Sequence, residues 1–368
     1  GNGGAQLRPT PTSATRISEL TPRPSAPGHV PAPRVYRGAV IGLGGIARTA
    51  HLPGFERDPL VSPRFKIVAT MDGGTGVAPM RGIPHFARLD DVRDAGPIDF
   101  VDICTPTASH LEITLWALEQ GYHVMCEKPV ALNRAEAARI SAAARAASRV
   151  VMPCHQYRYN PVWLKVREWL HHGVIGHWHL AEFQVHRLMA DRGTGASTET
   201  PWRGLAEHSR GGVLLDHGTH LIYQMLDAAG IPESVRAWTG QLRHADYDVE
   251  DSAQLLFEYP ERLGVMFLTW AARHRENRVR FVGERGSIEW IGGILRLERD
   301  GDVTSYDYSA ELDKSSYPGW FAGLFGAFAN AMDTGSAEPH LEDIRDVAAV
   351  LEAAYRSAAS GCRVSDLQ

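Results

Sequence analysis

The sequence is poor in cysteine and contains no paired-cysteine motif. Its 368 residues include four cysteines, and no two of them form a Cys-x-x-Cys pair. A disulfide framework is therefore not expected, and the composition favours the reducing cytoplasm. Cys104, Cys126 and Cys154 each follow an apolar run typical of a buried strand, where a thiol behaves as a small apolar side chain. The fourth is Cys362.

Long apolar runs and a strong charge imbalance are also missing. No stretch approaches the length of about 18 apolar residues that a membrane-spanning helix needs, so none is expected. The net charge of -5 gives no reason to expect binding to nucleic acid or to a membrane surface. The chain is 44% hydrophobic and 22% charged, which is ordinary for a globular protein, and its length favours two domains.

The first 34 residues have few large apolar side chains and are rich in Pro, Thr, Ser, Gly and Ala. Such a segment cannot bury enough surface to offset its chain entropy, so we predict that residues 1–34 form a disordered tail. The segment also lacks the apolar stretch of a secretion signal. We expect residues 35–154 to form one domain and residues 155–368 to form a second.

A glycine-rich turn is the first motif that indicates function. Residues 42–47 read Gly-x-Gly-x-x-Ala and directly follow the apolar run 39–41. Gly42 permits a tight turn, Gly44 leaves the backbone open to a pyrophosphate, and Ala47 allows close packing of the following helix. The residues between them are Gly45 and Ile46. The start of that helix can bind phosphate through free N–H groups and its dipole. We expect the helix to end near Pro53.

An acidic residue follows at the distance that dinucleotide-binding proteins use. The apolar run 66–71 ends in Asp72, and a carboxylate about 20 residues beyond the glycine turn can bond the adenosine ribose hydroxyls. Gly73 and Gly74 come next, so no adjacent arginine is available for a 2′-phosphate. We therefore predict NAD as the cofactor, with NADP disfavoured. The competing interpretation is that Asp72 is an ordinary turn residue.

Strands and helices alternate as far as residue 153, which predicts a parallel sheet with right-handed crossovers. Ligands of such sheets bind beyond the carboxyl ends of the strands. Asp72, Thr105-Pro106 and Glu127-Lys128 all follow apolar runs, so we expect them on one rim. A lysine at this rim can reach the space above a cofactor, although a Lys-Pro pair after a strand is also common turn chemistry.

From residue 155 the pattern changes to longer runs with strand character. Val235, Ala237 and Thr239 alternate with polar residues, which is typical of an antiparallel sheet with one covered face. The predicted strands are 177–188, 234–243, 252–258, 264–272, 277–282 and 287–290. Helices are predicted at 161–172, 320–333 and 341–360.

A second polar cluster lies at the start of a predicted helix. Asp216 and His220 are four residues apart and therefore share one helix face. The alternative is a helix-start cap followed by a satisfied histidine. His177 and His179 share one face of a predicted strand, but such pairs are usually structural, and no metal site is predicted.

Taken in order, these motifs resemble the glucose–fructose oxidoreductase / inositol dehydrogenase (Gfo/Idh/MocA) family. They are the glycine turn, residues 103–110 (Ile-Cys-Thr-Pro-Thr-Ala-Ser-His), Glu127-Lys128-Pro129, and Gly212 with Asp216-x-x-x-His220. The resemblance runs from Val35 to the C-terminus. It implies an α/β fold, with an N-terminal Rossmann domain and a C-terminal α/β domain built on a large, open-faced, mainly antiparallel sheet. That sheet commonly makes a homodimer or homotetramer interface.

The resemblance also implies an activity and roles for individual residues. The activity is NAD(P)-dependent hydride transfer at a hydroxyl-bearing carbon of a sugar, a cyclitol or another polyhydroxylated small molecule. Catalytic roles fall to Lys128, Asp216 and His220, and cofactor contacts to Thr105, Pro106, His110 and Glu127. Substrate contacts fall to Arg158 and Asn160. His217 stands where the family more often has an apolar residue, and it is a further candidate for substrate binding or for the base.

Two other functions remain open at this stage. One is an NAD-dependent glycoside hydrolase of the same superfamily, and the other is a dinucleotide-sensing regulator without turnover. For the dehydrogenase, an unperturbed histidine base predicts that oxidation rises with pH through about 6–8. Asp216 would orient His220 as that base.

Overall fold

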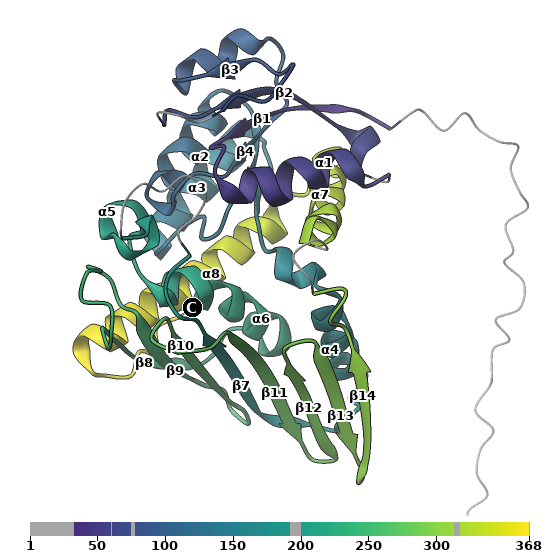
Figure 1. Ribbon diagram of the computed structural model, residues 1–368, viewed down its shortest axis with the longest axis vertical. Helices are drawn as coiled ribbons and strands as arrows, with labels where there is room; N and C mark the ends of the chain where they lie inside the picture. The colour runs from purple at the N-terminus through teal and green to yellow at the C-terminus, as the bar shows by residue number, and fades with distance from the viewer. Residues whose placement is uncertain (1–32, 60, 75–77, 192–199, 313–316, 368) are drawn as a thin grey trace, which may run out of the picture. The chain divides into compact units, whose positions relative to one another are not determined.

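The computed structural model describes residues 33–59, 61–74, 78–191, 200–312 and 317–367. Residues 1–32 lie outside the described part of the chain, so the disorder of the tail 1–34 stays a prediction. Residues Val35–Gln368 form a single compact unit (Figure 1). Two sheets organise this unit.

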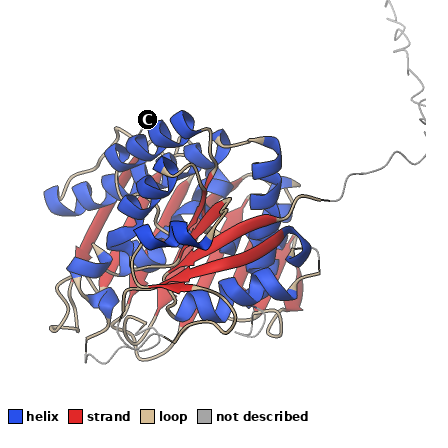
Figure 2. Cartoon of the chain, turned by 90° about the horizontal axis from the view of Figure 1, so that it is seen from above, coloured by secondary structure: helices blue, strands red, loops and turns tan. Residues whose placement is uncertain are grey.

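The first sheet has six parallel strands in the order β3-β2-β1-β4-β5-β6, which confirms the predicted Rossmann arrangement. The strands are β1 (Tyr36–Ile41), β2 (Phe65–Met71), β3 (His85–Phe86), β4 (Phe100–Ile103), β5 (His123–Cys126) and β6 (Val151–Pro153). Helices lie on both sides of these strands (Figure 2). They are α2 (His110–Glu119) and α3 (Arg134–Ala147) on one face, and α1 (Leu52–Arg57) on the other.

The helix after the glycine turn is longer than we predicted. It begins at Gly45, passes through a π-helical turn η1 (Ala47–His51) and continues as α1 to Arg57. Pro53 does not end it; the proline follows directly after the π-helical turn, where the ordinary α-helical hydrogen-bond pattern is already interrupted. His51 therefore points into the core from the middle of a continuous helix.

The second sheet has eight strands in the order β14-β13-β12-β11-β7-β10-β9-β8. They are β7 (Trp178–His186), β8 (Ser234–Gly240), β9 (Ser252–Glu258), β10 (Leu263–Thr269), β11 (Glu276–Gly283), β12 (Gly286–Ile291), β13 (Ile294–Arg299) and β14 (Asp302–Asp307). Every pair is antiparallel except β7–β10, which confirms the mainly antiparallel prediction. The hairpin β13–β14 was not predicted.

Helices cover one face of this second sheet. The covering helices are α4 (Pro161–His171), α6 (Thr219–Ala229) and α8 (Glu338–Ser360). Val235 and Ala237 are buried beneath them, whereas Arg236 and Trp238 on the same strand are exposed. The uncovered face exposes Trp238, Leu263, Ile291 and Ile294. The alternation read from the sequence therefore corresponds to one covered and one open face.

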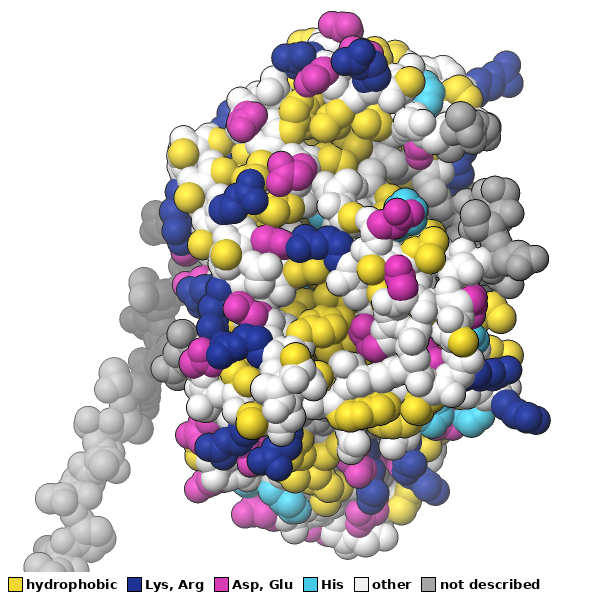
Figure 3. Space-filling model, turned by 90° about the vertical axis from the view of Figure 1, so that its left-hand side faces the viewer, with side chains coloured by type: hydrophobic (Ala, Val, Ile, Leu, Met, Phe, Trp, Pro, Cys, Tyr) yellow, Lys and Arg dark blue, Asp and Glu magenta, His cyan; other side chains and the backbone are white. Residues whose placement is uncertain are grey.

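The last two helices return to the first sheet. Phe325 of α7 (Tyr317–Thr334) stacks on Phe55 of α1, with ring centroids 3.8 Å apart. Leu341 and Ile344 of α8 pack in the same core as α2 and α3. The domain boundary at residue 154 stays a prediction, and the C-terminal helices complete the core of the N-terminal sheet. Charges of both signs interleave over the face drawn in Figure 3.

Candidate active site

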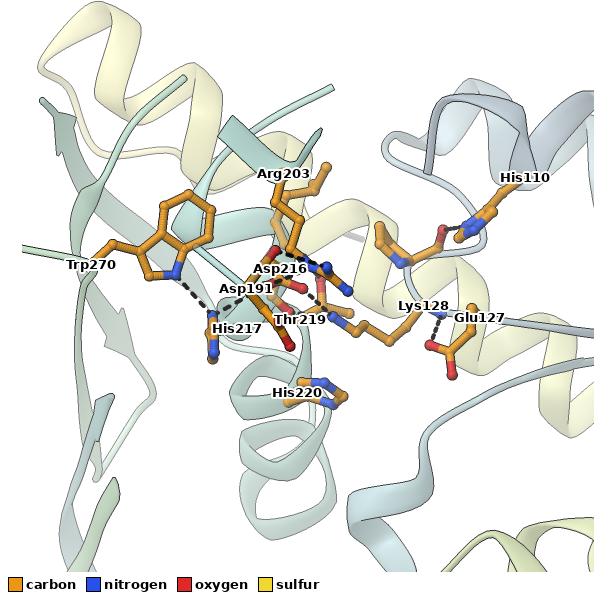
Figure 4. A network of polar contacts seen from close by, with 12 residues as sticks. His110, Glu127, Lys128, Asp191, Arg203, Asp216, His217, Thr219, His220 and Trp270 are labelled. Carbon is orange, nitrogen blue, oxygen red and sulfur yellow. Dashed lines mark hydrogen bonds and ion pairs between the residues drawn. The ribbon is translucent and has the colours of Figure 1, made fainter. Parts of the chain in front are cut away.

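A cavity of about 540 Å³ lies between the carboxyl ends of the first sheet and the start of α6. Residues from both halves of the chain line it. Of the predicted site residues, those lining the cavity are Ile46, Thr105, His110, Glu127, Lys128, Asp216, His217 and His220. Figure 4 shows the cluster formed by Lys128, Asp216, Arg203 and His217, with His220 beside it.

The glycine turn has the shape that a dinucleotide requires. Gly42 has φ +90, and a Cβ there would lie 2.9 Å from the carbonyl group of Cys104, so both its conformation and its packing favour glycine. A Cβ on Gly44 would meet nothing within 4 Å, which leaves that side of the turn open. The turn leads directly into the start of a helix, where free N–H groups can hold phosphate.

Asp72 lies against this turn. Its Oδ2 accepts a hydrogen bond from Leu43 N at 2.7 Å, and its Oδ1 accepts one from Gly74 N at 2.8 Å. Each carboxylate oxygen retains a lone pair, so the pair can also accept bonds from ribose hydroxyls. The residues present therefore fit NAD: Gly44 and the helix start would hold the pyrophosphate, and Asp72 would hold the adenosine ribose.

Lys128 and Asp216 form an ion pair that joins the two halves of the cavity. Lys128 Nζ donates to Asp216 Oδ1 at 2.7 Å and to the Asp216 carbonyl oxygen at 2.6 Å. An ammonium has three N–H donors, so one remains for a ligand. Burial alone would raise the pKa of Asp216, but the charges of Lys128 and Arg203 and the Lys128 hydrogen bond together outweigh burial and hold the pKa well below its usual value. Asp216 is therefore ionised.

The other partners of Asp216 differ from our expectation. Its Oδ2 lies 3.5 Å from Arg203 Nε and 3.3 Å from His217 Nδ1. His220 Nδ1 instead lies 2.8 Å from the Tyr223 hydroxyl, and its ring stacks on Tyr157. Helical spacing brought the aspartate and the histidine to the same region, but the ammonium of Lys128 is the stronger partner for the carboxylate. Tyr223 therefore takes the place that we predicted for Asp216 as the partner of His220.

His217 and His220 follow each other closely but have different hydrogen bonds. Trp270 Nε1 donates to His217 Nδ1 at 3.2 Å, and because an indole N–H can only donate, the proton of the neutral His217 ring lies on Nε2. The 3.3 Å approach of Nδ1 to Asp216 Oδ2 is therefore not a hydrogen bond. Burial, reinforced by the charges of Arg187 and Lys128, lowers the pKa of His217 to about 3. Burial and Lys128 also lower the pKa of His220 well below its usual value. Both rings are thus neutral at neutral pH. The rise of the oxidation rate with pH, which we predicted at about pH 6–8, is therefore expected at lower pH.

A buried charge network behind Lys128 was not predicted. His51 Nδ1 lies 2.8 Å from Asp102 Oδ2, and His51 Nε2 lies 2.9 Å from Glu127 Oε1. His51 and Asp102 are fully buried. Burial opposes charge on the His51 ring, but Asp102 outweighs it and raises its pKa well above the usual value. Burial would raise the pKa of Glu127, yet the His51 hydrogen bond keeps it low.

This network sets the position of the lysine. Glu127 Oε2 accepts a hydrogen bond from the backbone N–H of Lys128 at 3.2 Å. The sequence signal was an acidic residue, Asp102, inside a strand whose other residues are apolar. His51 lies on η1 and Asp102 on β4, 51 residues apart in the sequence, so only the three-dimensional structure pairs them.

His110 connects the two loops of the cofactor rim. Its Nε2 lies 2.9 Å from the Thr105 carbonyl oxygen, and its Nδ1 lies 2.8 Å from the Pro129 carbonyl oxygen. The ring is almost completely buried. Thr105 lines the cavity, and Pro106 precedes the short helix η4 (Thr107–Ser109). His110 therefore orders the rim, while its ring nitrogens are occupied by backbone groups.

Arg158 and Asn160, which we predicted to contact substrate, bind other parts of the chain, and their substrate contacts stay a prediction. Arg158 forms two hydrogen bonds to the carboxylate of Asp343, at 2.6 and 2.8 Å, and pairs with Asp227. Asn160 caps α4, where its Oδ1 accepts from Val162 N at 2.8 Å. Neither residue is among those that line the cavity. The segment approaches the cleft, but these side chains stabilise the join between helices.

Within the described ranges of the chain, two groups of side chains offer donor atoms with metal-ligand spacing. His186, His274 and Glu276 lie within 4.8 Å of one another at partly exposed positions, and the buried group is His51, Asp102 and Cys154. In the buried group, His51 already pairs with carboxylates. The prediction that the chain holds no metal ion stays a prediction.

The two halves of the chain each match a known protein family. Residues 36–155 match the oxidoreductase family with an NAD-binding Rossmann fold, and residues 163–289 match the GFO/IDH/MocA C-terminal domain. The fold and the site therefore define an NAD-binding oxidoreductase. The chain belongs to the GFO/IDH/MocA family.

Three relatives illustrate the range of the family. Oxidoreductase P35 of Formosa agariphila is 30% identical over 284 residues, which cover 73% of this chain and 84% of that protein. D-glucoside 3-dehydrogenase of Escherichia coli is 28% identical and matches 56% of this chain and 62% of its own length. A levoglucosan dehydrogenase, solved with NADH and levoglucosan, superposes with a TM-score of 0.77. It is 20% identical to this chain, and the match covers 91% of this chain and 100% of the neighbour.

A helix that crosses a bilayer must be both long and apolar. Among the residues that the structure describes, no helix combines the necessary length and apolar character.

Proposed function

We propose that the protein catalyses hydride transfer between NAD and a hydroxyl-bearing carbon of a sugar, a cyclitol or a related polyhydroxylated metabolite. One observation carries this proposal: Lys128 at the cofactor rim meets Asp216 and the neutral His220 in a single cavity. When bound, the nicotinamide supplies the hydride acceptor or donor. The protein residues then have to bind the alcohol and accept its proton.

Each polar group has a role that its hydrogen bonds allow. Lys128 has one N–H left after its two bonds to Asp216, and this donor can stabilise charge developing on the alcohol oxygen. His220 is neutral, and with its own proton on Nδ1, donated to the Tyr223 hydroxyl, Nε2 is the atom that accepts the substrate proton. His217 carries its proton on Nε2 and serves as a hydrogen-bond donor to substrate rather than as the base.

The assembly that we propose is a homodimer or homotetramer formed through the second sheet. The apolar side chains on its open face, which include Trp238, Leu263 and Ile294, support this interface. A cytoplasmic location stays a prediction, supported by four free cysteines of which three are buried. Sedimentation of the purified protein tests the assembly directly.

The activity is tested by incubating the protein with NAD and a panel of free sugars and inositols. Net NADH production, measured by absorbance, is expected with at least one compound. A hydrolase that recycles its NAD, or a regulator without turnover, would release no NADH. The absence of net NADH production with every compound would therefore contradict the proposal.

A further inference from the structure

The charges that line the cavity do not balance. Four cationic side chains face it, namely Lys128, Arg187, Arg203 and Arg275, against three carboxylates, namely Glu127, Asp191 and Asp216. Glu127 already pairs with the buried His51. Asp216 is shared between Lys128 and Arg203. Among the residues that the structure describes, the other two cations, Arg187 and Arg275, form no ion pair with a carboxylate.

Arg187 is the more unusual of the two, because it is only 6% exposed. It follows β7 directly. Its guanidinium donates to the carbonyl oxygens of His186 and Glu276 at 2.7 and 3.0 Å, and to Asn277 Oδ1 at 2.7 Å. All three acceptors are neutral. Within the described part of the chain, Arg187 Nε is buried without a hydrogen-bond partner.

A buried guanidinium without a counter-charge is costly. Removing an ion from water costs several kcal/mol, which neutral carbonyl groups offset only in part. Burial, together with the like charge of Arg275, lowers the pKa of Arg187 to about 10. The fold therefore holds a cation at an unfavourable place, and that place faces the cavity. An anionic group in the cavity would relieve both the burial and the repulsion.

Arg275 is the second cation at this part of the cavity. It is exposed, it lines the cavity, and it directly precedes β11, whose first residues Glu276 and Asn277 bind Arg187. The two guanidinium groups thus come from adjacent ends of neighbouring strands. Guanidinium groups bind carboxylate and phosphate oxygens through paired N–H donors, and this favours an oxyanion over a hydroxyl group.

We propose that the substrate is a polyhydroxylated compound carrying an oxyanion, either a carboxylate or a phosphate ester, which Arg187 and Arg275 bind. This inference rests on the proposed function and narrows its substrate class. It assigns Lys128 and His220 to the reacting hydroxyl and the two arginines to the charged end. Sugar acids and sugar phosphates share this chemistry, and the two sources are separated by experiment.

The test compares matched compounds with the full-length protein and NAD. D-glucose, D-gluconate and D-glucose 6-phosphate form one set, and myo-inositol with its monophosphate forms another. We expect kcat/KM to be about 10- to 100-fold higher for a charged member than for its neutral partner, the scale of hydrogen bonds to a charged group. Preference for gluconate identifies a carboxylate, and preference for a phosphorylated member identifies a phosphate ester.

Variants then connect this preference to the arginines. Arg187→Gln is expected to raise KM for the charged substrate by about 10- to 100-fold and to leave KM for NAD unchanged. Arg275→Gln, at an exposed position, is expected to act in the same direction and does not depend on Arg187 being replaceable in the core. Arg285→Gln is the matched control, because Arg285 pairs with Asp300 on the surface.

Thermal melting separates this inference from the proposed function. If gluconate or glucose 6-phosphate raises the Tm of the NAD-bound protein, glucose does not, and no NADH forms, the oxyanion site stands and the dehydrogenase proposal fails. If neutral and charged compounds react equally well, the dehydrogenase stands and the oxyanion site is wrong. The site is equally wrong if neither arginine variant changes KM for the charged compound, or if both change KM for NAD instead.

Discussion

The cofactor wall of the cavity, formed by Glu127 and Lys128 with His51 and Asp102 behind them, pairs its charges within the chain. His51 lies between two carboxylates, and Lys128 is held by Asp216. The substrate wall, formed by Arg187, Arg203, His217 and His220 with Arg275, has neutral histidines and a buried guanidinium whose acceptors are neutral. We infer that paired charges order the permanent part of the site, whereas incompletely paired charges bind the substrate.

The largest expected effect is on the substrate wall. His220→Ala should lower the turnover for alcohol oxidation by about 10²–10⁴-fold, because it removes the proton acceptor. The base must be neutral to act, and the pKa of His220 is lowered, so the acidic limb of the wild-type profile should lie below pH ~6.5. The pH dependence of kcat/KM measures both effects.

His217→Ala is the control for that experiment. It should change KM more than the pH profile, because His217 acts as a donor. If His217→Ala abolishes the acidic limb while His220→Ala retains it, the two histidines have been assigned the wrong way round.

On the cofactor wall, replacing His51 tests whether the charges there depend on one another. His51→Gln leaves Asp102 and Glu127 without a compensating cation, and breaking such a buried pair typically costs about 3–5 kcal/mol of unfolding free energy. Urea unfolding measures this loss. His171→Gln, at an exposed position on α4, is the matched control.

The loss of unfolding free energy in His51→Gln should also depend on pH. Because its folded pKa is raised, His51 contributes its full stability below pH ~6.5 and loses it as pH rises through the folded value. The unpaired carboxylates of the variant would instead bind protons on acidification. The gap between wild type and His51→Gln should therefore narrow as pH rises through the folded pKa of His51. Below pH ~6.5, where the His51 contribution is constant, the gap should narrow again as the carboxylates of the variant bind protons. A gap independent of pH would mean that lost packing alone explains it.

Lys128 joins the two walls, so its removal should affect chemistry without abolishing cofactor binding. We expect Lys128→Ala to lower turnover by about 10²-fold, the scale of one preorganised donor. NAD affinity, measured by fluorescence titration, should persist because the pyrophosphate and ribose contacts lie at Gly44 and Asp72. Lys165→Ala removes an exposed lysine paired with Glu168 and serves as the control. Near-normal turnover of Lys128→Ala would mean that Lys128 is an ordinary turn residue without a role in the chemistry.

The smallest expected effect concerns cofactor choice. Asp72→Asn keeps one acceptor oxygen for the turn but removes the charge that repels a 2′-phosphate. The preference of kcat/KM for NAD over NADP should narrow by about tenfold, the scale of one hydrogen bond to a charged group. Equal use of both cofactors by the wild type would show that Asp72 does not select between them.

Local patterns predicted the elements well where periodicity and caps agreed. The helix predicted at 161–172 agrees to within one residue with α4 (Pro161–His171), which begins after an Asn160 cap. The hairpin β13–β14 was missed because its last strand is exposed along its whole length and has no buried alternation. Side-chain partners were harder to predict, because they depend on contacts between distant segments.

At the site, the roles of Gly212 and Arg187 also depend on contacts with distant segments and could not be predicted from the sequence. A Cβ on Gly212 would lie 1.8 Å from the Glu250 carbonyl oxygen, so a glycine is needed there, but only the folded chain reveals that contact. Arg187 had no sequence signal beyond its place after a strand. Its importance comes from burial and from the neutral character of its partners, which are both tertiary properties. The two distant aspartates that bind Arg158 were likewise not evident from the sequence.

Both helices that bear on the site contain a π-helical turn, η1 (Ala47–His51) next to the glycine turn and η7 (Leu214–Gly218) next to His220. A π turn closes its hydrogen bond over one more residue than an α turn, so each can be regarded as a one-residue insertion in an α-helix. Deleting one residue from either turn would restore α-helical winding and rotate the side chains on one side relative to those on the other. The orientation of His51 and that of the Asp216–His217 pair can therefore be changed independently by single-residue deletions, without altering the sheets.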